Sequence, residues 1–172
     1  MGKLIILRGN SGSGKTTVAK ALQKKLGRNT MLISQDEVRR NMLWVDDGID
    51  TKALPLMAEL LRYGREHSEF SILEGIMYDE WYRSLFELAN ELYGSNVYAY
   101  YFDLPFEETV RRHNTRNREF GEKDMRRWWR EKDFSSALRE QAITCEMDTD
   151  SIVEKIYSDL NADRKAIAFM SI

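Results

Sequence analysis

The chain has 172 residues, of which 42% are hydrophobic and 31% charged, and a formal net charge of −2 at pH 7. This length is typical of one domain with a continuous core, and the charge balance gives no overall case for binding nucleic acid or a membrane surface. The single Cys145 excludes an internal disulfide, which is typical of a reducing cytoplasm, and we expect it to be a small core residue. No apolar run approaches the ~20 residues that cross a bilayer, so a cytoplasmic location is expected.

Short apolar runs alternate with longer amphipathic stretches, which predicts an α/β protein with a parallel sheet and helices on both faces. The first strand is expected at 3–8 and is apolar throughout, as a strand buried on both faces should be. A helix at 15–26 follows, and Gly27 ends it. The second strand, at 30–34, leads to a short helix for which Asp36 is a good N-cap.

The second half of the chain continues this alternation. A helix that starts at Thr51 precedes a third strand at 70–73, and a helix from Asp79 precedes a fourth strand at 97–102. The remaining predicted elements are a helix from Pro105, two helices of a basic segment that meet near Gly121, a weak strand at 142–146, and a terminal helix with a capping box of Ser151 and Glu154. Residues 161–172 fit either an extension of this helix or a tail. With no internal repeat or linker, residues 1–172 are expected to form a single domain.

The segment between the first strand and the first helix carries the strongest functional signal. It reads Gly9-Asn10-Ser11-Gly12-Ser13-Gly14-Lys15-Thr16-Thr17, which fits the phosphate-binding P-loop pattern G-x-x-x-x-G-K-[ST]. The glycines let backbone N–H groups point at phosphate oxygens, and the following helix adds the positive end of its dipole. Lys15 supplies a charge for the β- and γ-phosphates, and the Thr16 hydroxyl is a ligand for Mg²⁺.

The alternative is a glycine-rich turn that binds nothing. That interpretation does not account for a Lys-Thr pair at this spacing between a strand and a helix. We therefore predict that residues 9–17 bind ATP, with Lys15 also acting in catalysis and Thr16 holding Mg²⁺.

Carboxylates follow the second and third predicted strands, at the edge where ligands bind in an open parallel sheet. Asp36 is predicted to be the catalytic base that takes the proton of an acceptor hydroxyl, with a helix N-cap as its purely structural alternative. Glu74 follows Ile72 and Leu73 like the acidic end of a Walker B strand. It is predicted to contact substrate or metal, with a plain turn before Gly75 as the alternative.

Positive charge is concentrated in residues 111–132, which contain nine Lys or Arg and four Asp or Glu. The net charge of this segment is +5, so the rest of the chain carries −7. A solvated charged face is the alternative. The excess is mostly arginine, whose planar fork suits phosphate oxygens, and the segment follows the fourth strand, where a lid can close over a nucleotide. Arg112 and Arg116 share a helix face; we predict ATP binding for Arg112 and a catalytic role for Arg116. For Trp128 and Trp129 a hydrophobic hinge is favoured over base stacking.

With these residues in place, the chain resembles the small P-loop kinases, and among them kinases related to the zeta-toxin, chloramphenicol phosphotransferase and polynucleotide kinase group. The resemblance covers residues 3 to about 160. It is carried by these segments: Gly9–Thr17, Asp36-Glu37-Val38-Arg39, Ile72-Leu73-Glu74-Gly75, and Phe102-Asp103-Leu104-Pro105 leading to Arg112 and Arg116. The chain lacks the long inserted lid and glycine-rich acceptor signature of adenylate kinases, which weighs against a nucleoside-monophosphate kinase.

The resemblance implies a P-loop NTPase three-layer sandwich with a five-stranded parallel sheet in the order 2-3-1-4-5. It further implies ATP as donor, Asp36 as base, Arg39 near the acceptor and a short arginine-rich lid at about 111–132. The predicted function is therefore transfer of the γ-phosphate of ATP to a hydroxyl of a small molecule, with nucleosides, sugars and antibiotics as candidate acceptors. Two alternatives are a polynucleotide 5′-hydroxyl kinase, against which the net charge argues, and a nucleotide-dependent switch without an acceptor. The oligomeric state does not follow from the sequence.

Overall fold

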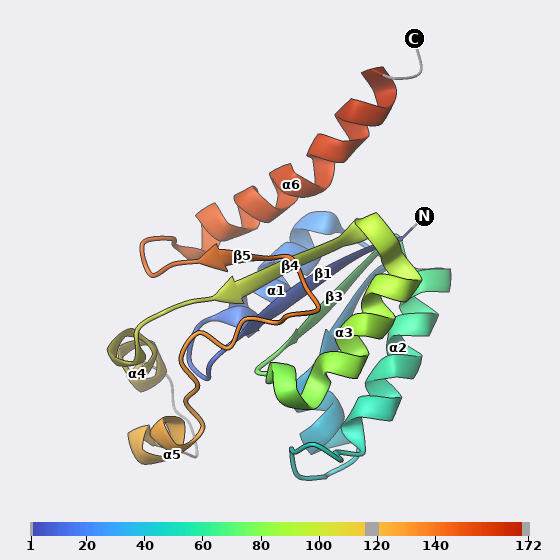
Figure 1. Cartoon of the computed structure of the whole chain (residues 1–172). Helices are drawn as coiled ribbons and strands as arrows, with labels where there is room; N and C mark the ends of the chain where they lie inside the picture. The colour runs from blue at the N-terminus through green and yellow to red at the C-terminus, as the bar shows by residue number, and fades with distance from the viewer. Residues whose placement is uncertain (1, 116–120, 170–172) are drawn as a thin grey trace.

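The computed structural model describes residues 2–115 and 121–169, which form a five-stranded sheet with helices on both faces (Figure 1). The strands are β1 (Lys3–Gly9), β2 (Thr30–Ser34), β3 (Phe70–Gly75), β4 (Val97–Phe102) and β5 (Glu140–Ile143). All neighbouring strands are parallel, in the order β2-β3-β1-β4-β5. The predicted fold class and strand order are confirmed.

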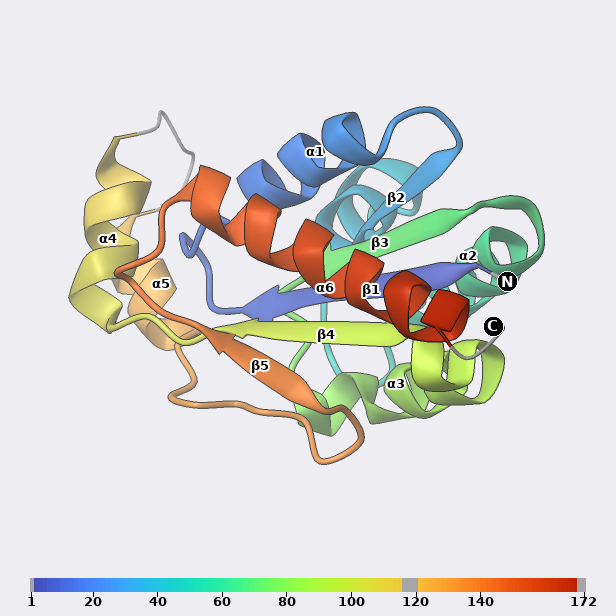
Figure 2. The ribbon, with the colours of Figure 1, turned by 90° about the horizontal axis from the view of Figure 1, so that it is seen from above.

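Helices form the outer layers of the sandwich. They are α1 (Lys15–Leu26), α2 (Ala53–His67), α3 (Asp79–Tyr93), α4 (Phe106–Asn114), α5 (Glu122–Arg127) and α6 (Thr149–Phe169), with a π-helical turn η1 (Glu37–Met42) and a 3-10 turn η2 (Gly94–Asn96). Helices α1 and α6 cover one face of the sheet and α2 and α3 the other, while α4 and α5 lie beyond the carboxyl ends of the strands (Figure 2). Within the described residues no helix is long and apolar enough to span a membrane.

The central strand β1 supplies both halves of the core. Leu4 and Ile6 pack with α2 and α3, whereas Ile5 and Leu7 pack with α1 and α6, and all four are fully buried. Because successive side chains of a strand point to opposite faces, a strand covered on both sides must be apolar at every position. This explains why β1 lacks the alternation of polar and apolar residues seen in half-exposed strands.

The differences from the sequence predictions lie at the ends of elements. Strand β5 starts two residues earlier than expected, and Cys145 is exposed after its end, so the prediction of a buried cysteine is wrong. Helix α6 starts at Thr149, and its first turn is capped by Asp148, whose carboxylate accepts the Ser151 N–H at 2.8 Å. The predicted capping box is wrong because Asp148 satisfies this end, while Glu154 pairs with Lys25 of α1.

A buried charge near the carboxyl end of β1 links three parts of the fold. The Arg8 guanidinium is fully buried and donates to both carboxylate oxygens of Glu140 on β5 at 2.8 and 3.0 Å. It also donates to the backbone and side chain of Asp133, both at 3.0 Å, and to the Met77 carbonyl at 2.9 Å. Each of its three nitrogens thereby has at least one hydrogen-bond acceptor. Burial raises the pKa of Glu140 and of Asp133, and the positive charge of Arg8 opposes that rise.

Replacing Arg8 with Met should lower the free energy of unfolding by about 3–5 kcal/mol, because Glu140 and Asp133 would lose the partner of their buried carboxylates. Urea denaturation at pH 7 measures this. Arg139→Met, at an exposed position beside β5, is the control and should change stability by less than ~0.5 kcal/mol. Equal stability of Arg8→Met and the wild type would contradict a structural role for this network.

Candidate functional site

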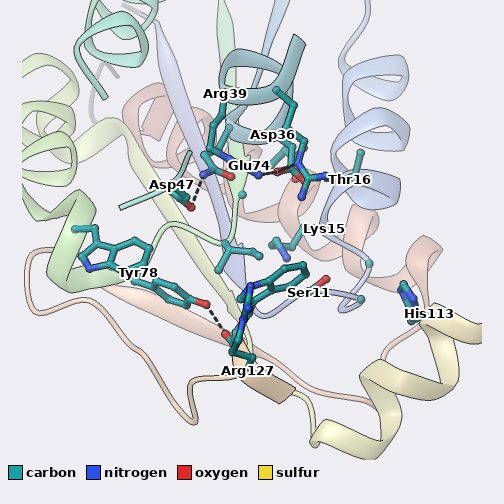
Figure 3. Close-up of a pocket in the computed structure, with 18 of the residues that line it drawn as sticks. Ser11, Lys15, Thr16, Asp36, Arg39, Asp47, Glu74, Tyr78, His113 and Arg127 are labelled. Carbon is teal, nitrogen blue, oxygen red and sulfur yellow. Dashed lines mark hydrogen bonds and ion pairs between the residues drawn. The ribbon is translucent and has the colours of Figure 1, made fainter. Parts of the chain in front are cut away.

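A cavity of about 430 Å³ opens at the carboxyl ends of the strands, between the P-loop and the segments that follow β2, β3 and α5 (Figure 3). Nine predicted site residues line it: Ser11, Gly12, Gly14, Lys15, Thr16, Asp36, Arg39, Glu74 and Arg112. Gly9, Asn10, Ser13 and Thr17 belong to the same loop and the start of α1 but lie outside this lining. Arg116 falls outside the described residues.

The conformation of the P-loop requires its glycines. Gly12 and Gly14 have φ of +77° and +99°, in the left-handed region that side chains disfavour. A Cβ on Gly12 would also lie 2.6 Å from the Thr109 carbonyl oxygen of α4, and one on Gly9 would lie 2.9 Å from the Phe102 carbonyl oxygen of β4. The loop is therefore closely packed against both neighbouring elements.

Lys15 is held inside the loop by neutral oxygens. Its Nζ donates to the Asn10 carbonyl at 2.7 Å and to the Ser13 hydroxyl at 3.1 Å. Lys15 is only 6% exposed. Burial lowers the pKa of Lys15 to about 8, although the negative charges of Glu74 and Asp36 act to raise it. A buried ammonium group with this environment would be stabilised by an anionic ligand.

Oxygen ligands gather where α1 meets β3. The Thr16 hydroxyl donates to Glu74 Oε2 at 3.1 Å, and the Ser34 hydroxyl donates to Glu74 Oε1. Hydroxyl and carboxylate oxygens are the ligands Mg²⁺ prefers, and a protein commonly supplies only one or two of them while phosphates and water complete the shell. Thr16 and Glu74 supply one oxygen ligand of each kind and so fit this shared mode of binding. The described residues contain no group of three or more His, Cys, Asp or Glu suited to a metal.

Asp36 lies in the first turn after β2, and its side chain does not cap a helix. Its own backbone is helical, with φ −64° and ψ −39°, and its side chain makes no capping hydrogen bond. The N-cap prediction is therefore wrong, because an N-cap residue has non-helical dihedral angles. Oδ1 instead accepts hydrogen bonds from Arg39 Nη2 at 3.0 Å and Arg40 Nε at 3.2 Å, and the half-exposed carboxylate lies at the cavity near Thr16 (Figure 3).

Part of the basic segment reaches the P-loop. Arg112 Nη1 donates to the Ser13 carbonyl at 3.2 Å, while its Nε donates to Glu108 at 2.6 Å. Arg111 pairs with the same carboxylate at 2.7 Å but is exposed. Hydrogen bonds from Arg111 and Arg112 lower the pKa of Glu108 to about 2. Only Arg112 of this pair lines the cavity.

Sequence reasoning assigned no individual site role to the other polar and aromatic residues of the lining. They are Gln35, Arg40, Asp46, Asp47, Tyr78, Trp81, His113, Arg127 and Trp128. Gln35 and Tyr78 follow β2 and β3, so their position after a strand was a usable signal. The Asp47 carboxylate accepts hydrogen bonds from Gln35 Nε2 at 2.9 Å and from the Tyr82 hydroxyl at 2.6 Å. No local sequence pattern predicts these contacts, because the partners lie 12 and 35 residues away in the chain.

Two further predictions are modified by the structure. The Asn10 carboxamide, predicted to bind ATP, donates to the Arg130 carbonyl at 2.7 Å and accepts the Arg130 N–H at 3.0 Å. Trp129 packs edge-on against Phe106 with ring centroids 5.1 Å apart. Trp128 lines the cavity instead.

The strand order, the glycine-rich loop between β1 and α1 and the cavity beside it define the P-loop kinase fold. The sequence matches the family described as AAA domain over residues 4–134, and the chain belongs to this family. No curated protein gives a significant match.

Solved structures share the whole fold. A gluconokinase from Sinorhizobium meliloti is 17% identical with a TM-score of 0.70, covering 99% of this chain and 98% of that one. Shikimate kinase from Acinetobacter baumannii, in complex with shikimate, is 18% identical with a TM-score of 0.61 and 95% coverage of both chains. APS kinase from Mycobacterium tuberculosis, in complex with AMPPNP and APS, is 18% identical with a TM-score of 0.57, covering 91% of this chain and 96% of that one. At these identities the likeness shows the fold.

Lys15 should give the ligand-free protein a distinctive pH dependence of stability. Its pKa is about 8 in the folded protein and 10.5 in the reference state, so the unfolded chain binds more protons between these values and stability rises with pH there. Lys15→Met should therefore be more stable than the wild type at pH 7, by up to ~3 kcal/mol at 1.36 kcal/mol per pKa unit. This advantage should disappear by pH 10.5.

Urea denaturation at pH 7, 9 and 10.5 measures this difference. Lys20→Met, at an exposed position of α1, is the control and should follow the wild type at each pH. Parallel pH profiles of Lys15→Met and the wild type would contradict the burial of a charged lysine.

Proposed function

We propose that this protein is an ATP-dependent kinase that transfers the γ-phosphate of ATP to a hydroxyl group of a small molecule. The observation that carries this proposal is that the Asp36 carboxylate shares one cavity with Lys15 and Thr16 of the P-loop. A phosphate held by the loop and a hydroxyl held by the carboxylate can then meet in the same cavity. Such positioning supplies most of the catalysis in phosphoryl transfer.

The donor half of the site follows from the P-loop. Its backbone N–H groups and the Lys15 ammonium bind the β- and γ-phosphates, and Arg112 adds a positive charge beside Ser13. Thr16 and Glu74 would hold Mg²⁺, which supplies neutralisation of phosphate charge when bound. We retain Arg116 as a proposed catalytic residue, and 111–132 as a proposed lid of a single domain spanning 1–172.

The acceptor half depends on Asp36. Arg39 and Arg40 both bind its Oδ1, which fixes the carboxylate and leaves Oδ2 to accept the proton of the acceptor hydroxyl. As the hydroxyl oxygen bonds to the γ-phosphorus, the bond from phosphorus to the β,γ-bridging oxygen breaks and ADP leaves. Arg39, in the same cavity, is the proposed acceptor-binding residue beside Glu74.

The size of the cavity supports a small acceptor. A volume of about 430 Å³ lies within the ~300–1,000 Å³ typical of small-molecule pockets. The structures of similar fold include a gluconokinase and a shikimate kinase. The narrower relationship to zeta-toxin, chloramphenicol phosphotransferase and polynucleotide kinase-like enzymes rests on the sequence motifs alone. The proposed cytoplasmic location rests on the cysteine content and hydropathy of the sequence.

The function is tested by ADP release over a panel of nucleosides, sugars, sugar acids and hydroxyl-bearing antibiotics, followed by Asp36→Asn with the acceptor found. Asparagine keeps the size but cannot take the proton, so transfer should fall by ~10²-fold or more while ATP affinity stays near the wild-type value. Single-turnover kinetics measure the chemical step. Glu37→Gln, at an exposed neighbouring position, is the control and should transfer normally.

An undiminished chemical step in Asp36→Asn would remove Asp36 as the base and direct attention to Glu74. ATP hydrolysis that no acceptor stimulates would favour the nucleotide-dependent switch instead of a kinase.

The contribution of the basic segment is tested by a matched pair of arginines. Arg111 and Arg112 both bind Glu108, but only Arg112 reaches the Ser13 carbonyl. Arg112→Ala should slow phosphoryl transfer at least tenfold, because a cation beside the phosphates is lost, with stability within about 1 kcal/mol of the wild type. Arg111→Ala should transfer at the wild-type rate. Equal rates for the two variants would exclude a specific role for Arg112.

A further inference from the structure

Three aromatic side chains line the cavity outside the P-loop: Tyr78, Trp81 and Trp128, here called the aromatic wall. Tyr78 directly precedes α3, Trp81 lies in the first turn of α3, and Trp128 follows α5. Trp81 and Trp128 are only partly buried. Part of the Trp81 indole at the cavity is therefore available to a ligand, whose binding would remove apolar area from water. The Arg127 guanidinium lies 5.8 Å from the Trp128 ring centroid.

The aromatic wall is fixed by contacts behind it. The Tyr78 and Trp81 rings lie edge to face, with centroids 4.8 Å apart, and the Tyr78 hydroxyl donates to the Trp128 carbonyl. The Arg130 guanidinium lies 4.3 Å from the Tyr78 ring centroid and 5.3 Å from that of Trp81. A platform already held in place loses little conformational entropy when a ligand stacks on it.

Arg130 is itself held from two directions. Its side chain pairs with Glu80 at 2.9 Å, and its backbone exchanges two hydrogen bonds with the Asn10 carboxamide of the P-loop. Arg130 is thus a positioning residue that connects the aromatic wall with the phosphate-binding loop.

The rest of the acceptor side is charged. In Figure 3, Asp36 and Arg39 lie on one side of the cavity, and Tyr78 lies on the other, with Lys15 between them. Arg39 has an unused donor, because its buried Nε has no hydrogen-bond partner among the described residues. Guanidinium groups also stack on aromatic faces, which a saturated ring or an open chain does not offer.

We propose that the acceptor is a planar aromatic compound that carries the reacting hydroxyl, with its ring stacked on the aromatic wall. This proposal rests on the kinase function proposed above and specifies the substrate class. The ring lies on Trp81, the hydroxyl faces Asp36, and a hydrogen-bond acceptor or anionic substituent of the ring faces Arg39. An open-chain polyol leaves the aromatic wall exposed to water and gains none of this contact.

The test compares two compounds that differ only in the ring: para-hydroxymethylbenzoate and its trans-cyclohexane analogue. Adenosine and pyridoxine serve as larger aromatic probes, and glucose and gluconate as non-aromatic ones. Calorimetry measures binding to the full chain with and without a non-hydrolysable ATP analogue, and ADP release measures transfer separately. Stacking is worth ~1–3 kcal/mol per ring, so the aromatic member of the matched pair should bind at least fivefold more tightly.

Trp81→Leu should weaken binding of the aromatic member at least fivefold and leave the analogue and ATP affinities unchanged. Trp81→Phe, which keeps a ring face, should restore most of the loss. Trp129→Leu, whose ring packs on Phe106 outside the cavity, is the control and should leave the affinities for both compounds unchanged. Melting temperatures confirm that each variant is folded.

Equal affinity for the two ring compounds, equal losses for both in Trp81→Leu, or no binding by any aromatic probe would overturn the proposal. Binding of aromatic probes without any stimulated ADP release would leave the aromatic site standing and contradict the kinase function. The two proposals therefore fail in different measurements.

Discussion

The buried guanidinium of Arg8 is the interaction on which the geometry of the cavity depends. It lies one residue before Gly9, at the point where β1 gives way to the P-loop, and it joins β5 through Glu140 and the segment after α5 through Asp133. Asp133 in turn accepts the backbone N–H of Asp79 at the start of α3. Removing the Arg8 charge by itself would be destabilising, because its carboxylate partners are buried with it and would lose their counter-charge. The network therefore fixes the P-loop relative to the segments that carry Tyr78 and Trp128.

The charged side chains of the site are also held in place by hydrogen-bond partners. Lys15 has hydroxyl and carbonyl oxygens as hydrogen-bond partners, and its lowered pKa shows that burial outweighs the nearby carboxylates. Asp36 is oriented by two arginines, and Arg112 is oriented by Glu108. Charges that are placed in advance need no reorganisation when a ligand with complementary charge arrives, which is the main electrostatic route to catalysis.

The pairing within the basic segment also bears on the choice of acceptor. Arg111 and Arg112 share Glu108, Arg126 lies 3.6 Å from Glu122, and Arg130 pairs with Glu80. Four of the nine basic residues of 111–132 thus have a carboxylate partner among the described residues. A polynucleotide groove needs unpaired cations along its length, and these four pairs remove some of them, which favours the small acceptor proposed above.

The sequence by itself determined the P-loop, the buried strand before it and the helix after it. These features depend on residues close together in the chain: glycines at a fixed spacing, an apolar run, and Gly27 as a helix end. The positions of Asp36 just beyond β2 and of Glu74 at the carboxyl end of β3 were sufficient to place both at the cavity. The strand order followed from the family resemblance, since local patterns do not specify which strands pair.

Only the tertiary structure decided the remaining features. The sequence predicted Arg8 only as part of a strand, because its hydrogen-bond partners lie 69 to 132 residues away in the chain. The sequence predicted Trp128 to be a hinge residue. In the structure it lines the cavity, because β5 and the Arg8 network bring its segment back beside α3. Local propensity reflects neighbours within one or two turns, whereas these contacts exist only once strand order and register have brought distant segments together.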